Sequence, residues 1–173
     1  MADHNNPENW DMAKLVLQRN DEAIRFSETK AALLLTFIGV LFTIVIDKVE
    51  YFQEYTASAN YPGRNLLVTS EIVIFLGIIV VTIASIYVIF PRLYAPKEFS
   101  VFFFGNYKTS TESESITAFS KLTNAEKMEH IVTEIHTTST IAGRKFRGVQ
   151  VALAGTILIF VGFIMVCITL YFW

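Results

Sequence analysis

The chain has 173 residues, of which 53% are hydrophobic and only 17% are charged. A soluble domain usually carries about a quarter charged residues, so this composition argues against a soluble domain and favours a membrane protein. The net charge of −2 indicates neither an acidic nor a basic partner, and the single cysteine, Cys167, excludes an internal disulfide.

Residues 1–30 are predicted to form a cytoplasmic amphipathic helix. Trp10, Ala13, Leu17 and Ile24 share one face at helical spacing, and charged residues lie on the other faces. The segment is rich in acidic residues, whereas a signal peptide begins with a short basic segment. The apolar block that follows is therefore predicted to remain in the membrane.

Three apolar blocks are predicted to cross the bilayer as helices. Because a span needs roughly 20 apolar residues, the two uncharged blocks at residues 72–90 and 151–173 are long enough. The block at residues 31–46 is shorter, and we expect its helix to continue on both sides. Residues 47–71 then form an external loop, and residues 91–150 form a cytoplasmic loop and a stalk helix.

The distribution of lysine and arginine predicts the orientation. Residues 1–30 hold four of these basic residues, 47–71 hold two, and 91–150 hold eight. Because basic residues concentrate in cytoplasmic segments, the N-terminus and the long loop are predicted to lie inside and the C-terminus outside.

The long loop ends in a second strong helical pattern. Thr123 and Glu126 have the spacing of a capping box, and apolar residues at helical spacing follow it into the third span. Earlier in the loop, the polar segment Thr109–Ser115 is predicted to be irregular. The aromatic segment Phe99–Gly105 fits a strand, a turn or an interfacial anchor. The fold class expected is an all-α membrane protein with three transmembrane helices, the first and third extended into the cytoplasm as amphipathic stalks.

The sequence lacks the signatures of an active site. The motifs G-x-x-x-x-G-K-[ST], G-x-G-x-x-G, H-E-x-x-H and G-x-S-x-G are absent, so we expect no enzymatic activity and no cofactor. Glu126, His130 and Glu134 recur at every fourth position, but on a charged helix face such residues usually form solvated pairs, so no metal site is predicted. The spans hold no Lys, Arg, Asp or His at mid-depth, which argues against a transporter and against an open pore in one copy.

Small residues form a stripe at the start of the third span. Such a stripe lets two helices approach closely, either with helices of the same chain or between copies in an oligomer, and the sequence leaves both possibilities open. The candidate oligomerisation residues are Gly148, Ala152, Gly155 and Gly162.

Basic residues cluster where the predicted stalks meet the membrane. They could set the topology and bind anionic lipid, or they could surround a pocket for an anionic ligand. Guanidinium groups bind phosphate in a bidentate manner, so several of them at one site would suit a nucleotide. The candidate ligand-binding residues are Arg25, Lys30, Arg92, Arg144, Lys145 and Arg147.

Four short segments at the predicted spans and in the long loop stand out, namely Ser27–Phe37, Pro91–Leu93, Phe103–Gly105 and Ile141–Arg147. In this order they resemble the acidic-x-Lys-Ala-x-x-Leu-Leu, Pro-Arg-Leu, aromatic-Phe-Gly and Lys-aromatic-Arg motifs of the Pycsar-type transmembrane effectors of bacterial antiphage defence. The sequence has Phe146 where that family often has tyrosine. A looser resemblance is to other small helical membrane effectors of nucleotide-based defence. The matched positions are Glu28, Lys30, Arg92, Phe104, Gly105, Lys145 and Arg147.

The resemblance implies a role in abortive infection. A partner cyclase would make a cyclic nucleotide, with a cyclic pyrimidine monophosphate favoured. The effector would bind this nucleotide, form a homo-oligomer and impair the bacterial inner membrane, without binding DNA or RNA. The alternative is a membrane scaffold that recruits a soluble partner through its cytoplasmic helices, without sensing a nucleotide.

Overall fold

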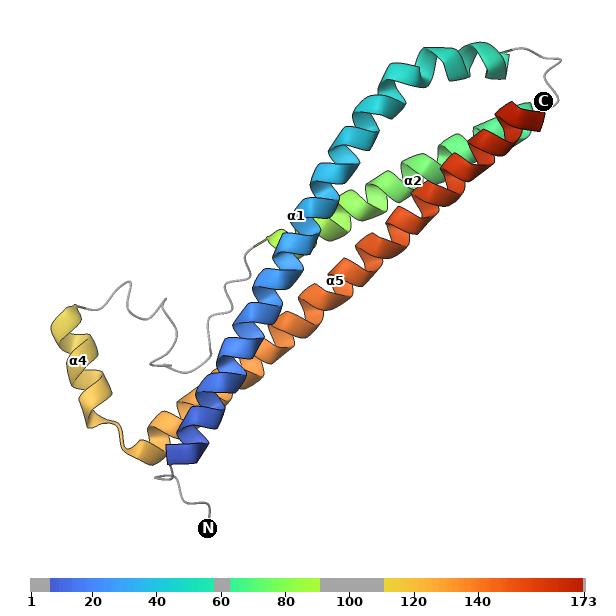
Figure 1. Cartoon of the computed structure of the whole chain (residues 1–173). Coiled ribbons are helices and arrows are strands. Elements are labelled where there is room, and N and C mark those ends of the chain that lie inside the picture. Colours follow the sequence, from blue (N-terminus) through green and yellow to red (C-terminus); the bar gives the residue numbers. More distant parts are fainter. Residues whose placement is uncertain (1–6, 58–62, 91–110, 173) are drawn as a thin grey trace. The chain divides into compact units, whose positions relative to one another are not determined.

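In a computed structural model, residues 7–57, 63–90 and 111–172 are described, and they form four helices (Figure 1). These are α1 (Pro7–Ala57), α2 (Arg64–Ile89), α4 (Glu112–Lys121) and α5 (Asn124–Phe172). Three of them, α1, α2 and α5, are long and apolar enough to cross a membrane. The predicted fold class, an all-α membrane protein with three spanning helices, is therefore confirmed.

Two helices run far beyond the predicted spans. Helix α1 has 51 residues and α5 has 49, and each contains a predicted span together with the polar segment before it. Helix α1 also continues past Ile46 to Ala57, so part of the predicted external loop is helical. No proline interrupts either helix after its first position, which permits unbroken backbone hydrogen bonding. That the extensions are amphipathic stalks in the cytoplasm stays a prediction.

The chain forms two compact units. The first contains residues 1–25 and 91–144, and the second contains residues 26–90 and 145–173. Helices α1 and α5 each contribute to both units.

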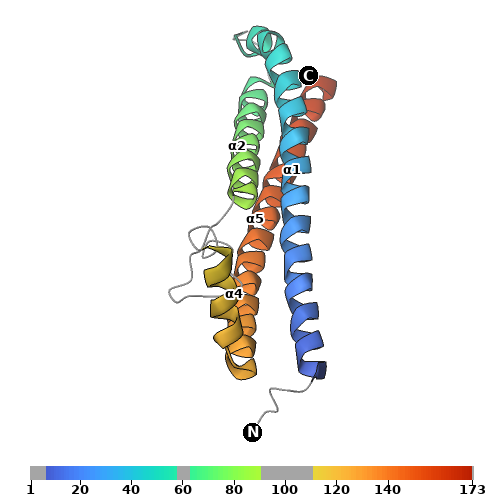
Figure 2. The same ribbon diagram turned by 90° about the vertical axis from the view of Figure 1, so that its left-hand side faces the viewer.

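In the first unit, the beginnings of α1 and α5 lie side by side in parallel (Figures 1 and 2). Ala13 and Ile131 are buried, and Trp10, Leu17 and Ile24 are half-buried, so the apolar face predicted for α1 is its packed face. The α1 positions follow the alternating spacing of three and four residues that is typical of coiled-coil seams.

A polar side chain lies in the same seam. The two N–H groups of the Asn20 side-chain amide are shared among three acceptors, the Ile135 carbonyl (3.2 Å), Thr138 Oγ1 (3.0 Å) and Ser139 Oγ (2.8 Å). A hydrogen-bonded asparagine in a seam fixes the register of two helices, because shifting them leaves the amide without partners. Asn20 therefore determines which turns of α1 and α5 meet in this unit.

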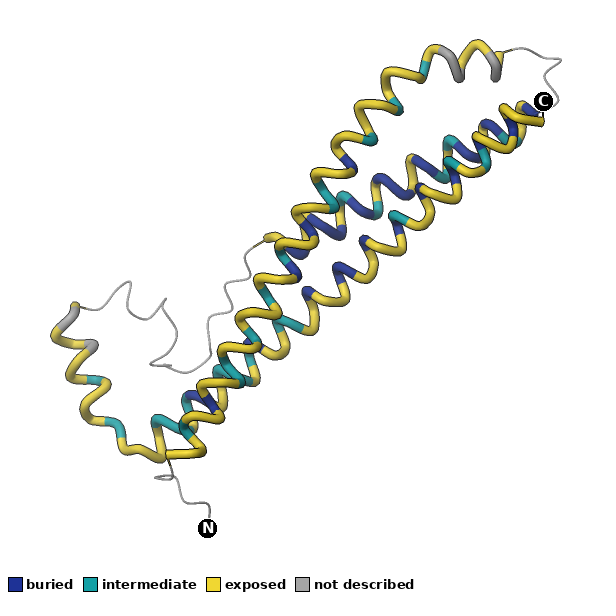
Figure 3. The backbone as a smooth tube through the Cα atoms, viewed as in Figure 1, coloured by how far each residue is buried: buried dark blue, intermediate teal, exposed yellow. Residues whose placement is uncertain are grey.

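The second unit is a three-helix bundle in which α1 and α5 run in the same direction and α2 runs in the opposite direction (Figure 2). Buried positions follow the facing sides of α2 and α5 (Figure 3). Most of the bundle's outer surface consists of exposed apolar side chains, as expected where lipid takes the place of water. The core consists of Ile38, Leu67, Ile74, Ile78, Val81, Ala84, Ala152, Ile159 and Val166.

The capping box predicted at the start of α5 is confirmed. Glu126 Oε2 accepts hydrogen bonds from the backbone N–H (2.7 Å) and the hydroxyl (2.8 Å) of Thr123, and the Glu126 N–H donates to Thr123 Oγ1 (3.3 Å). A second capping box, formed by Thr111 and Glu114, begins α4. The prediction that Thr109–Ser115 is irregular is therefore wrong from Glu112 onward, because the Thr111 cap starts a helix there.

Substituting Thr123 tests this cap. Thr123→Ala is expected to destabilise the first turn of α5 by about 1 kcal/mol, which corresponds to roughly fivefold faster amide hydrogen exchange there. Hydrogen bonds from the Thr123 backbone and hydroxyl lower the pKa of Glu126 below its ordinary value of 4.5. The ionised carboxylate therefore stabilises the cap above pH 4.5, and this stabilisation is lost as the pH falls through the lowered pKa. Equal exchange in both proteins at neutral pH would contradict the assignment.

Candidate functional site

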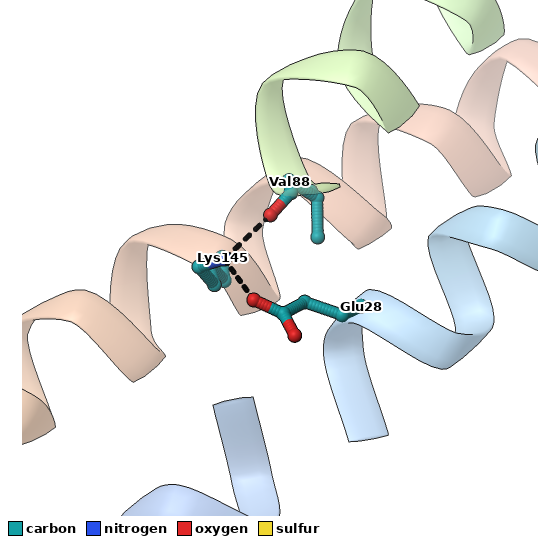
Figure 4. Close-up of polar contacts among 3 residues, drawn as sticks. All are labelled: Glu28, Val88 and Lys145. Atoms are coloured by element: carbon teal, nitrogen blue, oxygen red, sulfur yellow. Dashed lines mark hydrogen bonds and ion pairs between the residues drawn. The ribbon is translucent and has the colours of Figure 1, made fainter. Parts of the chain in front are cut away.

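The most distinctive site of the second unit is a buried lysine that joins three helices (Figure 4). Lys145 of α5 is only 3% exposed. Its ammonium donates to Glu28 Oε1 of α1 (2.5 Å) and to the backbone carbonyl of Val88 near the end of α2 (2.7 Å). We call Glu28, Val88 and Lys145 the Lys145 cluster.

The cluster lies where α2 ends. The last four carbonyls of a helix have no partner within it, and Val88 is the penultimate residue of α2. An ammonium at this position satisfies the carbonyl and interacts favourably with the negative end of the helix dipole. Lys145 thereby caps α2 from a neighbouring helix.

The two charges of the cluster differ in their access to solvent. The Lys145 side chain is 3% exposed, whereas the Glu28 side chain is 40% exposed. Lysine is almost never fully buried unless its charge is paired, because an isolated buried ammonium loses its hydration. Glu28 is therefore the counter-ion that permits Lys145 to lie in the interior.

The remaining predicted ligand-binding residues are not members of the Lys145 cluster. Arg25 and Arg144 are exposed in the first unit, and Lys30 and Arg147 are exposed in the second. The Lys30 ammonium lies 4.1 Å from the centre of the Phe26 ring, in cation–π geometry. Arg92 and the predicted Phe103–Gly105 motif lie outside the described residues. Binding of an anionic ligand by these cations stays a prediction.

The stripe of small residues packs against α2 within the chain. A Cβ placed on Gly162 would lie 3.1 Å from the Ser70 carbonyl oxygen, and one on Gly155 would lie 3.2 Å from that of Gly77. Ala152 is completely buried. Packing within the chain was one of the two possibilities that the sequence left open. Self-association through the same residues would require α2 to move away, and it stays a prediction.

The acidic residues considered as metal ligands, Glu126 and Glu134, lie in different environments. Glu126 caps α5, as described above. Burial raises the pKa of Glu134, and the carboxylate of Asp21 makes a smaller contribution in the same direction. Across residues 7–57, 63–90 and 111–172, no group of three His, Cys, Asp or Glu side chains is arranged to hold a metal ion.

Sequence reasoning named Lys145 as a ligand-binding residue and did not foresee its ion pair. Glu28 and Lys145 are opposite charges shortly before the first and third spans, which is a usable signal once those helices are known to run parallel. Val88 carried no signal, because its contribution comes from the backbone.

A comparison with family models matches residues 12–173 to one described as the Pycsar effector protein domain. No curated protein and no solved structure shows significant similarity to the chain.

Proposed function

The chain belongs to the Pycsar effector family and is thus a membrane effector of cyclic-nucleotide antiphage defence. We propose that it acts by oligomerising and impairing the inner membrane. It performs no catalysis in this role. The positive-inside distribution of Lys and Arg supports a cytoplasmic N-terminus and long loop, so that the basic residues of segments 1–30 and 91–150 face the cytoplasm.

The second unit is a bundle with an apolar core, which we call the closed arrangement. This packing supports activation by rearrangement. Among the described residues of this unit, the buried polar side chains are few, and the single charged one, Lys145, is paired with Glu28. Ions need a hydrated or polar path across a bilayer, and the apolar core of one bundle offers none. Impairing the membrane therefore requires the helices to separate or several copies to assemble.

The ligand is a cyclic nucleotide, and a cyclic pyrimidine monophosphate is favoured, made by a cognate cyclase. Its phosphate would be bound by exposed cations that stand close to the predicted spans, such as Lys30 and Arg147 of the second unit. The ligand shifts a pre-existing equilibrium from the closed to the active arrangement, and it can do so only through its higher affinity for the active one. The Lys145 cluster stabilises the closed arrangement.

Binding measurements with purified protein test this proposal. Titration calorimetry with cyclic CMP and cyclic UMP is expected to detect binding of one of them, and Arg147→Ala is expected to weaken it about tenfold through loss of a charge-assisted phosphate contact. Lys14→Ala, an exposed cation near the start of α1, is the matched control and should bind normally. Absence of binding by either nucleotide would contradict direct sensing.

The alternative, a scaffold that recruits a soluble partner, makes the opposite prediction. It requires an available apolar face on α5, but Ile131 is already buried within the first unit. A scaffold would be insensitive to Arg147→Ala and would lose function on Val132→Asp, since Val132 is exposed on the same helix.

A further inference from the structure

Among the described residues of the second unit, two of the cavities lie along the seam between α1 and α2. The first, of about 300 Å³, is lined mainly by apolar residues such as Val45, Ile74 and Phe163, but Lys48 and Glu71 also line it. The second, of about 330 Å³, is lined by α1 residues including Leu35 and Gly39 and by Ile78 and Thr82 of α2. Helix α1 separates from α2 and α5 toward its C-terminal end, on the side of the first cavity (Figure 1).

The two charged residues of the first cavity lie at one level of the membrane. Lys48 follows the predicted span 31–46, and Glu71 directly precedes the predicted span 72–90. Both therefore lie at the same membrane surface, while Ile74 and Phe163 lie inside the hydrocarbon region. The first cavity is thus charged at the headgroup level and apolar below it.

The second cavity continues the seam toward the middle of the bilayer. Gly39 precedes Lys48 by nine residues, or about 14 Å along a helix. Half of the hydrocarbon region is about 15 Å thick, so the two cavities together cover the depth of one acyl chain. A Cβ placed on Gly39 would have no atom within 4 Å, so this part of the seam is open toward the bilayer.

The charges at the surface select among lipids. Lys48 presents a cation, which is also paired with Asp47 at 2.8 Å, and Glu71 presents a carboxylate to the same cavity. A zwitterionic headgroup complements both charges, whereas an anionic headgroup would meet the Glu71 carboxylate. A primary ammonium also donates hydrogen bonds to a carboxylate, which a quaternary ammonium cannot.

We infer that the α1–α2 seam binds a zwitterionic aminophospholipid, with its phosphate at Lys48, its ammonium at Glu71 and one acyl chain in the two cavities. The lipid completes the packing of α1 at the level where this helix separates from α2 and α5. This inference goes beyond the proposed function and holds whether or not the chain binds a nucleotide.

Lipid retention by the purified protein tests the inference. The full chain is reconstituted in nanodiscs of equimolar phosphatidylethanolamine, phosphatidylcholine and phosphatidylglycerol, and is then extracted with detergent. Mass spectrometry of the retained lipids is expected to show phosphatidylethanolamine enriched about fivefold over each of the other two, as one favourable interfacial charge pair implies. Equal retention of the three lipids would overturn the inference.

Three variants separate the headgroup from the chain. Glu71→Gln is expected to remove the preference for phosphatidylethanolamine over phosphatidylglycerol. Gly39→Phe fills open space in the second cavity and is expected to remove most of the retained lipid. Gly143→Phe is the matched control, because a Cβ at Gly143 also meets no atom within 4 Å and Gly143 lines neither cavity. Retention by Gly39→Phe equal to that of the control, or an unchanged preference in Glu71→Gln, would contradict the assignment.

Discussion

Replacing Glu28 with alanine is expected to lower the free energy of unfolding by about 3 kcal/mol. The substitution leaves the Lys145 ammonium, which is 3% exposed, with the Val88 carbonyl as its remaining partner in the cluster. Removing one partner of a buried ion pair typically costs about 3–5 kcal/mol, because the other charge stays buried without compensation. The lower end of this range applies because the Glu28 side chain is itself 40% exposed.

Lys145→Met is expected to cost less, about 1–2 kcal/mol. It leaves the Glu28 carboxylate, which can turn to solvent, and it retains most of the apolar volume of the lysine side chain. The double variant should be more stable than Glu28→Ala alone, since it no longer buries a charge. Chemical or thermal unfolding in mild detergent measures the three values. A Glu28→Ala protein as stable as Lys145→Met would contradict the unequal burial of the two charges.

Glu28→Ala and Lys145→Met also test how the protein is activated. Because the cluster joins α1, α2 and α5, weakening it should favour the active arrangement and cause growth inhibition without the ligand. Asn20→Ala is the appropriate comparison, since it removes the amide hydrogen bonds of the first unit and leaves the Lys145 cluster intact. Ligand-independent growth inhibition by Lys145→Met, but not by Asn20→Ala, is the expected result.

Gly77→Val is expected to destabilise the second unit by about 3 kcal/mol. A Cβ at Gly77 would lie 2.9 Å from the Gly155 carbonyl oxygen and 2.5 Å from Ile159 Cγ1. The side-chain atom can move, but the backbone oxygen moves only if α2 and α5 separate, and such overpacking costs about 1–3 kcal/mol or more. The separation would also weaken the contact of Lys145 with the end of α2.

Gly143→Val is the matched control for this substitution. A Cβ at Gly143 meets no atom within 4 Å, so only the difference in helix propensity remains, which is about 0.3 kcal/mol in favour of valine. Both proteins are compared by unfolding in detergent. Equal stability of the two variants would show that α2 and α5 do not approach as closely as the glycines indicate.

Local sequence signals predicted the helices well. The apolar blocks identified the three spans, and the Thr123–Glu126 spacing identified the start of α5, because caps and spans depend on residues that are neighbours in the chain. The Thr111–Glu114 cap has the same spacing and was nevertheless missed, because the surrounding segment is short and polar.

The Lys145 cluster could not be predicted from local sequence, because its residues are far apart in the chain. It requires α1 and α5 to run in parallel in one register and α2 to end at the same level, so that residues 117 positions apart meet. In the sequence, Lys145 stands among other basic residues and was grouped with them as a ligand-binding residue. The small residues had the same ambiguity, since a stripe such as Gly148, Gly155 and Gly162 indicates close packing without identifying the partner helix.

Ligand-dependent permeability of reconstituted vesicles is the most direct test of the proposed function. The purified chain is incorporated into vesicles of phosphatidylethanolamine and phosphatidylglycerol that contain a self-quenching dye. Release is then followed on addition of cyclic CMP, cyclic UMP or non-cyclic CMP. We predict no release from the closed bundle without ligand and rapid release with one of the cyclic nucleotides, but not with non-cyclic CMP. Intact vesicles under all conditions, or release that is independent of ligand, would contradict a nucleotide-gated membrane effector.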